Sequence, residues 1–281
     1  MNETLKRSIS GAVYVILLIS SILFSSDTFF ILFGIFLLIA VFEFCNLVHL
    51  NKIIPVFLAC LAYGSISFLL YNDVTLSKNF DLTLLAATLV VSIKCIVFLF
   101  SNKQRGTDTV SKYVYLIGYI ILPFLILTKI PFGVKGYNPK ILIGIFILIW
   151  TNDTFAYIVG KSIGRTKLFE KISPKKTVEG FLGGVVFSLI TGLLISKYYI
   201  QPLVKFQETS MIIWLIFAFI VSVFGTIGDL IESKFKRVAG VKDSGKIMPG
   251  HGGVLDRLDS VIFVAPFIYL FYQILSYVTF P

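Results

Sequence analysis

The chain consists of long apolar runs separated by short polar segments. A transmembrane helix needs about 20 consecutive, mostly apolar residues, and nine runs approach that length. We expect helices at 8–25, 28–48, 54–71, 82–100, 113–129, 139–160, 180–198, 211–231 and 259–279. The first run lacks the small-residue cleavage pattern of a signal peptide and is expected to remain as a span. The pattern predicts an all-α integral membrane protein with about nine transmembrane helices.

The composition agrees with this pattern. Of the 281 residues, 57% are hydrophobic and only 14% are charged, which lies outside the range of soluble globular domains. The net charge of +10 does not indicate nucleic-acid binding, because the bases lie in short loops between helices and form no continuous stripe. We expect a single polytopic domain in which residues 1–137 form a helical scaffold and residues 138–281 carry the chemistry.

The distribution of lysine and arginine predicts the orientation. Cytoplasmic loops are enriched in these bases, and 18 of the 25 lie on the side that contains the N-terminus. The polar loops at 161–179 and 232–258 carry six each, and the remaining loops split six to six. The N-terminus and the active-site cleft are therefore expected to face the cytoplasm, a prediction that depends on the two large loops.

Two ionisable residues stand out in the first five spans. Glu43 lies near the end of the second span, where it is either an interfacial carboxylate paired with a base or a functional group. Lys94 lies deep in the fourth span, and an intramembrane charge is costly and usually paired or pathway-lining. A lysine can also extend its amine to the interface. Both interpretations stay open for each residue.

The sixth span contains the polar sequence WTNDTFAYIVG. Asn152 lies next to Asp153, and Asp153, Tyr157 and Gly160 recur at helical spacing on one face. Small residues on that face would let another helix or a ligand approach closely. A carboxylate within the bilayer costs free energy, and one without a function is therefore unfavourable. We expect Asp153 to face the protein interior and to have a function.

The loop before the seventh span ends in SPKKTVEG, residues 173–180. Ser173 followed by Pro174 is typical of a helix N-cap and first helical residue, which would place Lys175, Lys176 and Thr177 at a helix N-terminus. Such an end favours anions. Two lysines there could equally anchor the chain at anionic lipid headgroups.

The longest polar segment, residues 229–259, holds 11 of the 40 charged residues. Its acids are Asp229, Glu232, Asp243, Asp256 and Asp259, and its bases are Lys234, Lys236, Arg237, Lys242, Lys246 and Arg257. With His251 and five glycines they suit phosphates and a divalent metal, since Mg²⁺ takes carboxylate and phosphate oxygens. A helix continued past Asp229 brings further charged residues onto the same face, and Asp256 and Asp259 share a face where the last span starts. A salt-bridge network between helix ends is the structural alternative.

Three motifs carry a family resemblance. They are Ser233-x-Phe-Lys-Arg, Lys242-Asp243-x-Gly and Pro249-x-His251-Gly-Gly-x-x-Asp256-Arg257-x-Asp259. This segment resembles the signature of the CDP-diacylglycerol synthases, also called phosphatidate cytidylyltransferases, and NDTFAY and SPKKTVEG are similar to the family's other recurring segments. The resemblance implies a multi-span enzyme of phospholipid biosynthesis that uses CTP, phosphatidate and Mg²⁺, with a second metal ion as an option. A bacterial inner membrane is the expected location.

The resemblance and the residue chemistry together predict the site. The residues expected in catalysis are Asp229, Asp256, Lys236, Arg237, Lys242, Asp243, His251 and Arg257. Those expected to bind substrate are Asn152, Asp153, Tyr157, Ser173, Lys175, Lys176, Thr177, Glu179, Ser233, Gly252 and Gly253, and those expected to hold metal are Asp229, Asp256, Asp259 and Asp243. His251 is expected to orient a group and not to accept a proton, because the attacking phosphatidate oxygen is already anionic.

Two rival functions remain at this stage. A CTP-dependent polyprenol or dolichol kinase would also need metal and basic groups, but it would release CDP. A transporter would use intramembrane charges along a substrate path, and it would carry broken helices and polar motifs in both halves, whereas the motifs here lie in one half. Membrane lipids are expected partners and a homodimer is left open.

Overall fold

The computed structural model describes residues 3–72, 74, 76–101, 108–133, 136–200 and 207–279. Four bases that enter the orientation prediction, Lys103, Arg105, Lys135 and Lys205, lie outside the described residues. Within the described part, nine helices or helix runs are long and apolar enough to cross a membrane. The prediction of an all-α membrane protein with nine spans is confirmed.

The helices follow the predicted runs closely. The first four spans are α1 (Glu3–Phe24), α2 (Ser26–Val48), α3 (Ile53–Tyr71) and α4 (Lys78–Phe100), and the fifth consists of α5 (Thr109–Tyr115), the π-helical turn η1 (Leu116–Ile121) and α6 (Leu122–Lys129). The last four are α7 (Pro139–Ile163), α8 (Val178–Leu194) with η2 (Ile195–Tyr199), α9 (Gln207–Val238) and α10 (Leu255–Thr279). Two antiparallel hairpins join β1 (Phe132–Gly133) to β2 (Gly136–Tyr137) and β3 (Lys167–Phe169) to β4 (Ser173–Thr177).

The π-helical turn in the fifth span has a local cause. Pro123 follows it in the first turn of α6, and a proline ring has no N–H and collides with the carbonyl four residues earlier. A wider turn just before the proline relieves that collision. The span therefore stays continuous across the proline.

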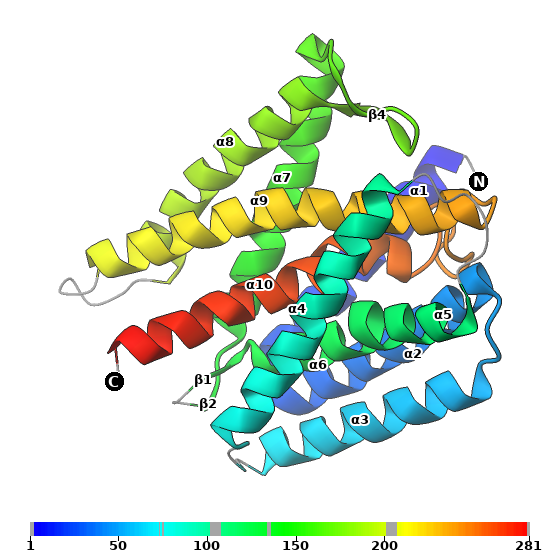
Figure 1. Cartoon of the computed structure of the whole chain (residues 1–281). Helices are drawn as coiled ribbons and strands as arrows, with labels where there is room; N and C mark the ends of the chain where they lie inside the picture. The colour runs from blue at the N-terminus through cyan, green and yellow to red at the C-terminus, as the bar shows by residue number, and fades with distance from the viewer. Residues whose placement is uncertain are drawn as a thin grey trace.

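Four helices, α7, α8, α9 and α10, surround the polar segments. In Figure 1, α7 and α8 extend beyond α9 on one side, and α2, α3 and α6 gather on the other. α7 packs along α8, and α9 packs on both α8 and α10. The close approach of α7 and α8 depends on small residues, because a Cβ on Gly180 would lie 2.6 Å from the carbonyl oxygen of Ala156. The predicted close packing on this face of the sixth span is confirmed.

The predicted helix start at Ser173 is wrong. Residues 173–177 form strand β4, in which Ser173 pairs with Phe169 and Thr177 pairs with Lys167. The N-cap of α8 is Thr177, whose Oγ1 accepts a hydrogen bond from the Gly180 amide at 3.1 Å. Pro174 is tolerated because a proline is accepted in an edge strand, where its missing N–H breaks no ladder bond.

The polar segment forms two helix ends and a loop between them. α9 continues seven residues past the predicted end, so that Asp229 lies inside the helix, and α10 begins at Leu255, which places Asp256 in its first turn. We call residues 239–254 the glycine-rich loop. Figure 1 shows this loop beside the beginning of α1.

Candidate active site

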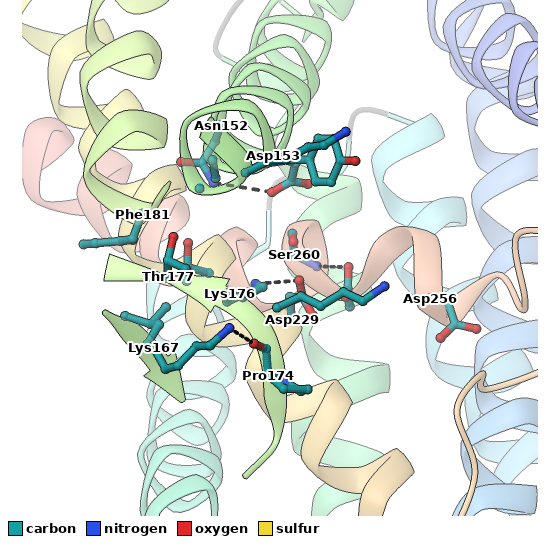
Figure 2. A pocket seen from close by; sticks show the side chains of 18 of the residues that line it. Asn152, Asp153, Lys167, Pro174, Lys176, Thr177, Phe181, Asp229, Asp256 and Ser260 are labelled. Carbon is teal, nitrogen blue, oxygen red and sulfur yellow. Dashed lines mark hydrogen bonds and ion pairs between the residues drawn. The ribbon is translucent and has the colours of Figure 1, made fainter. Parts of the chain in front are cut away.

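A pocket of about 720 Å³ lies among α7, β4, α9 and α10 (Figure 2). Its lining includes twelve of the predicted site residues: Asn152, Asp153, Tyr157, Lys175, Lys176, Thr177, Asp229, Lys236, Asp243, Asp256, Arg257 and Asp259. We call it the main pocket. The three segments that the motifs singled out, far apart in sequence, thus meet around one cavity.

Three carboxylates form a tight group beside the pocket. Single oxygens of Asp229, Glu232 and Asp259 lie within 4.8 Å of one another. α10 can bring Asp259 this close because α9 has a glycine at position 228, where a Cβ would lie 2.9 Å from the Asp259 carbonyl oxygen. Glu232 was not among the predicted metal ligands, although its spacing of three from Asp229 places both on one face of α9.

Glu232 is almost completely buried, with 1% of its side chain exposed. Within the described residues neither of its carboxylate oxygens has a partner in hydrogen-bond geometry. Lys236 Nζ nevertheless lies 2.5 Å from Glu232 Oε2 and 2.6 Å from Asp256 Oδ1. We interpret the Glu232 contact as an ion pair, since Coulomb attraction depends little on angle. One lysine therefore joins the carboxylate group to the start of α10.

Lys176 is the second cation in contact with the group. Its Nζ lies 2.6 Å from Asp229 Oδ2 (Figure 2). Ser233 Oγ donates to Asp229 Oδ1 at 3.2 Å. Burial lowers the pKa of Lys176, but the charge of Asp229 and its hydrogen bond outweigh that effect and raise the pKa above its ordinary value. Lys176 is therefore protonated at physiological pH. Its side chain is partly buried, whereas that of its neighbour Lys175 is exposed.

Asp256 has a different environment from Asp229. Its Oδ2 accepts hydrogen bonds from the Ser244 amide at 2.8 Å, the Ser244 hydroxyl at 2.8 Å and the Gly253 amide at 2.7 Å, while Oδ1 receives Lys236. Figure 2 shows Asp256 well apart from Asp229. Both oxygens are thus occupied by protein donors, and Asp256 ties the glycine-rich loop to α10. Metal binding by Asp256 and Asp243 stays a prediction, and the geometry favours Glu232 as the third carboxylate.

Glu43 is a part of the site that the sequence left open. It is buried, and its carboxylate accepts hydrogen bonds from the Val254 amide at 3.1 Å, the Leu255 amide at 2.8 Å and the Ser244 hydroxyl at 3.1 Å. No base pairs with it among the described residues. Glu43 caps the N-terminus of α10 from a different helix, where a negative charge is favourable.

Lys94, the other residue left open, lies away from the pocket lining. Its Nζ lies 3.4 Å from Ser111 Oγ, to which it donates, and 5.1 Å from the centroid of the Tyr115 ring. Asp153 faces the main pocket, in agreement with the expectation that it faces the interior of the protein, and its side chain is exposed to that cavity. Its function stays a prediction. The amide of Asn152 donates to Asp153 at 3.4 Å.

The remaining predicted residues fall into two sets. Lys242, His251 and Gly252 line a second pocket of about 320 Å³, which shares Asp243 and Arg257 with the main pocket. Five others, Arg237, Ser173, Glu179, Ser233 and Gly253, are not in the lining of either pocket. Arg237 Nε donates to the Ile172 carbonyl at 3.2 Å, and Glu179 accepts from the Thr166 amide at 3.1 Å. Both contacts hold the β3–β4 hairpin in place.

The fold and the pockets define a multi-pass membrane protein with a polar cavity that lysine, arginine and aspartate side chains line. Residues 5–275 match the model of the cytidylyltransferase family, and the chain belongs to this family. A Staphylococcus saprophyticus protein named phosphatidate cytidylyltransferase is 50% identical over 123 residues, which cover 43% of this chain and 44% of that protein. A Bacillus subtilis protein of the same name is 47% identical over 130 residues, 46% of each chain. The chain thus spans less than half the length of each relative in these matches.

Proposed function

We propose that the chain is a phosphatidate cytidylyltransferase that converts CTP and phosphatidate to CDP-diacylglycerol and pyrophosphate. The observation that carries the proposal is the main pocket, whose Asp229 and Asp259 lie next to the buried Glu232 and whose Lys176 and Lys236 pair with these carboxylates. Family membership and the names of the bacterial relatives support the same reaction. The proposal includes a cytoplasmic-facing site in a bacterial inner membrane.

The chemistry requires positioning and charge neutralisation more than proton transfer. A phosphatidate oxygen forms a bond to the α-phosphorus of CTP, the bond between that phosphorus and the bridging oxygen breaks, and the electron pair leaves on pyrophosphate. The attacking oxygen is already an anion, so no strong general base is needed. Lys176, Lys236 and Arg257, all lining the main pocket, would hold the reacting phosphates in line and offset their charge.

The carboxylate group fits a magnesium ion. Oxygen ligands are what Mg²⁺ prefers. Glu232 Oε1 is buried without a partner among the described residues, while Oε2 forms the ion pair with Lys236. Asp229, Glu232 and Asp259 would hold the ion. A bound Mg²⁺ supplies positive charge that polarises phosphate oxygens and stabilises the leaving pyrophosphate.

Apolar side chains on the side of α7 and α8 outline a route for the lipid substrate. Ala156, Leu168 and Phe181 add apolar surface to the lining of the main pocket. Beside them, Ile158 and Leu182 are exposed and are expected to face the acyl chains of the bilayer. We propose that phosphatidate enters with its phosphate toward Lys176 and its acyl chains along these two helices.

One assay on purified protein in neutral detergent separates this proposal from its rivals. Pyrophosphate must appear from CTP only when phosphatidate is added, together with CDP-diacylglycerol. Release of CDP on addition of a polyprenol would instead identify a kinase. Failure to turn over either lipid, with uptake of a solute by reconstituted vesicles, would identify a transporter.

The magnesium proposal makes its own prediction. Chelation of divalent ions should abolish turnover, and Asp229→Asn should reduce kcat at least tenfold, equivalent to about 1.4 kcal/mol of barrier, because charge stabilisation at the phosphates is lost. Asp27→Asn, in the first turn of α2, is the matched control and should keep normal activity. Undiminished turnover by Asp229→Asn, or by the chelated enzyme, contradicts the assignment.

A further inference from the structure

The second pocket lies between the beginning of α1 and the glycine-rich loop. Its volume is about 320 Å³, and it opens beside the main pocket, with which it shares Asp243 and Arg257. Its lining is Arg7, Lys242, Asp243, Gly245, Lys246, Met248, Pro249, Gly250, His251, Gly252 and Arg257. Arg7 and Lys246 have no place in the site predicted from sequence.

The charge of this pocket is largely uncompensated. Four cations, Arg7, Lys242, Lys246 and Arg257, face a single carboxylate, Asp243. Among the described residues, no ion pair joins any of these cations to a carboxylate. The lining of the main pocket, by contrast, contains five aspartates for its six lysines and arginines, and two of those lysines, Lys176 and Lys236, pair with carboxylates. Unpaired cations around a concave site create a positive potential that attracts an anion.

Specific contacts hold the two walls of the pocket together. Ser10 Oγ of α1 lies 2.7 Å from His251 Nδ1 and donates to the Pro249 carbonyl at 2.9 Å. The stem of Arg7 packs over Gly250, where a Cβ would lie 2.5 Å from Arg7 Cγ. Gly250 has a φ of +77°, a conformation that glycine adopts without strain. The cations are thus carried on a defined loop and helix.

Burial and the neighbouring positive charges act on the pKa of His251 in the same direction. Burial lowers the pKa of His251, and the charges of Arg257 and Arg7 lower it further. The imidazole is therefore neutral at pH 7. An anion bound in this pocket would offset the two guanidinium groups and make the protonated ring easier to form.

We propose that the second pocket binds the two terminal phosphates of CTP and then the pyrophosphate that leaves. This inference rests on the proposed function. Arg257 lines both pockets, so a nucleotide with its α-phosphate near Asp229 can pass Arg257 and place its remaining phosphates between Arg7 and Lys246.

A phosphate group could reach this pocket from the nucleotide or from a lipid headgroup. The lining favours the nucleotide, because Met248 and Pro249 are its only apolar side chains, whereas acyl chains need an extended apolar wall. Pyrophosphate also carries more negative charge than a phosphomonoester, which suits four unpaired cations. The main pocket, with its apolar side on α7 and α8, is the better place for the lipid.

Histidine NMR tests the proposal without relying on turnover. The chain has two histidines, and His49→Asn leaves His251 as the only one. Asparagine suits position 49 because its φ is +54°, a region that asparagine tolerates. In zwitterionic micelles, saturating inorganic pyrophosphate should raise the pH midpoint of the His251 titration.

Two variants identify the cations that bind. Arg7→Gln and Lys246→Gln should each weaken pyrophosphate binding about tenfold, the loss of one charge-assisted contact. Lys52→Gln, a base at the start of α3 outside the pocket lining, is the matched control and should bind as the unmodified chain does. Arg7→Gln should also raise the midpoint without pyrophosphate, because Arg7 lowers it.

The outcomes distinguish the sources of phosphate. The proposal is overturned if pyrophosphate leaves the pH midpoint of His251 unchanged. If micelles that contain phosphatidate shift the midpoint and pyrophosphate does not, the phosphate bound here belongs to the lipid, and the proposal is likewise overturned. Equal binding by Lys246→Gln and Lys52→Gln likewise refutes the role of this pocket. If the same sample still makes CDP-diacylglycerol, only the subsite fails. If it makes none, the proposed function fails separately.

Discussion

Replacement of Glu43 by alanine tests how the glycine-rich loop is held. The substitution removes the acceptor of the Val254 and Leu255 amides, which are buried at the start of α10. Ser244 loses one partner but keeps Asp256, 2.8 Å away. Each buried amide left without an acceptor costs about 1–3 kcal/mol, so Glu43→Ala should destabilise the protein by about 2–6 kcal/mol, a large part of a typical total stability.

A second substitution separates hydrogen bonding from space filling. Glu43→Gln keeps the volume and one acceptor oxygen, but it places an amide donor either against the Val254 amide or against the Leu255 amide and the Ser244 hydroxyl. Its cost should therefore be intermediate, about 1–3 kcal/mol for one unsatisfied donor. Because Ser244 also contacts Asp256, and Asp256 contacts Lys236, kcat should fall in both variants in the same order.

The assay is unfolding in detergent micelles at a fixed heating rate, since membrane proteins often unfold irreversibly, combined with pyrophosphate release. Asp27→Asn, another acid of α2, is the control and should change neither quantity. The reasoning is refuted if Glu43→Ala lowers the apparent unfolding temperature by less than about 2 °C, the shift that about 1 kcal/mol produces in a chain of this size, or if Glu43→Gln lowers it more than Glu43→Ala does.

Three further predictions follow from other parts of the chain. Asp81→Asn leaves the buried amine of Lys129 without its carboxylate and should cost about 3–5 kcal/mol on thermal unfolding; an unchanged melting temperature would show that the pair contributes nothing. Lys176→Gln should raise KM for phosphatidate and leave KM for CTP unchanged, because one point-charge contact to the lipid phosphate is lost; if steady-state kinetics in neutral micelles give two unchanged KM values, the β3–β4 hairpin is only an anchor. In a cysteine-free background, Asp243→Cys should react with an impermeant thiol reagent from the cytoplasmic face and Asp27→Cys from the opposite face; the reverse pattern overturns the orientation.

Hydropathy alone predicted the spans because crossing a bilayer is a local demand on each segment. A helix must be apolar along its own length whatever it packs against, so the nine runs could be recognised one at a time. The cluster of carboxylates at the polar end of α9 could be predicted for a similar reason, since helical spacing places Asp229 and Glu232 on one face. The motifs of the sixth and last spans were recognisable through their resemblance to a known family.

Tertiary structure decided which groups meet. Glu43 caps α10 although about 210 positions separate them, and no local pattern in a helix reveals a partner at that distance. Residues 173–177 became a strand because β3 supplies a pairing edge, which outweighs the capping preference of Ser173. Asp229 meets Glu232 and Asp259, while Asp256 is held by loop amides, because the crossing of α9 and α10 at Gly228 sets these distances. The charges were visible in the sequence, but their partners depended on packing.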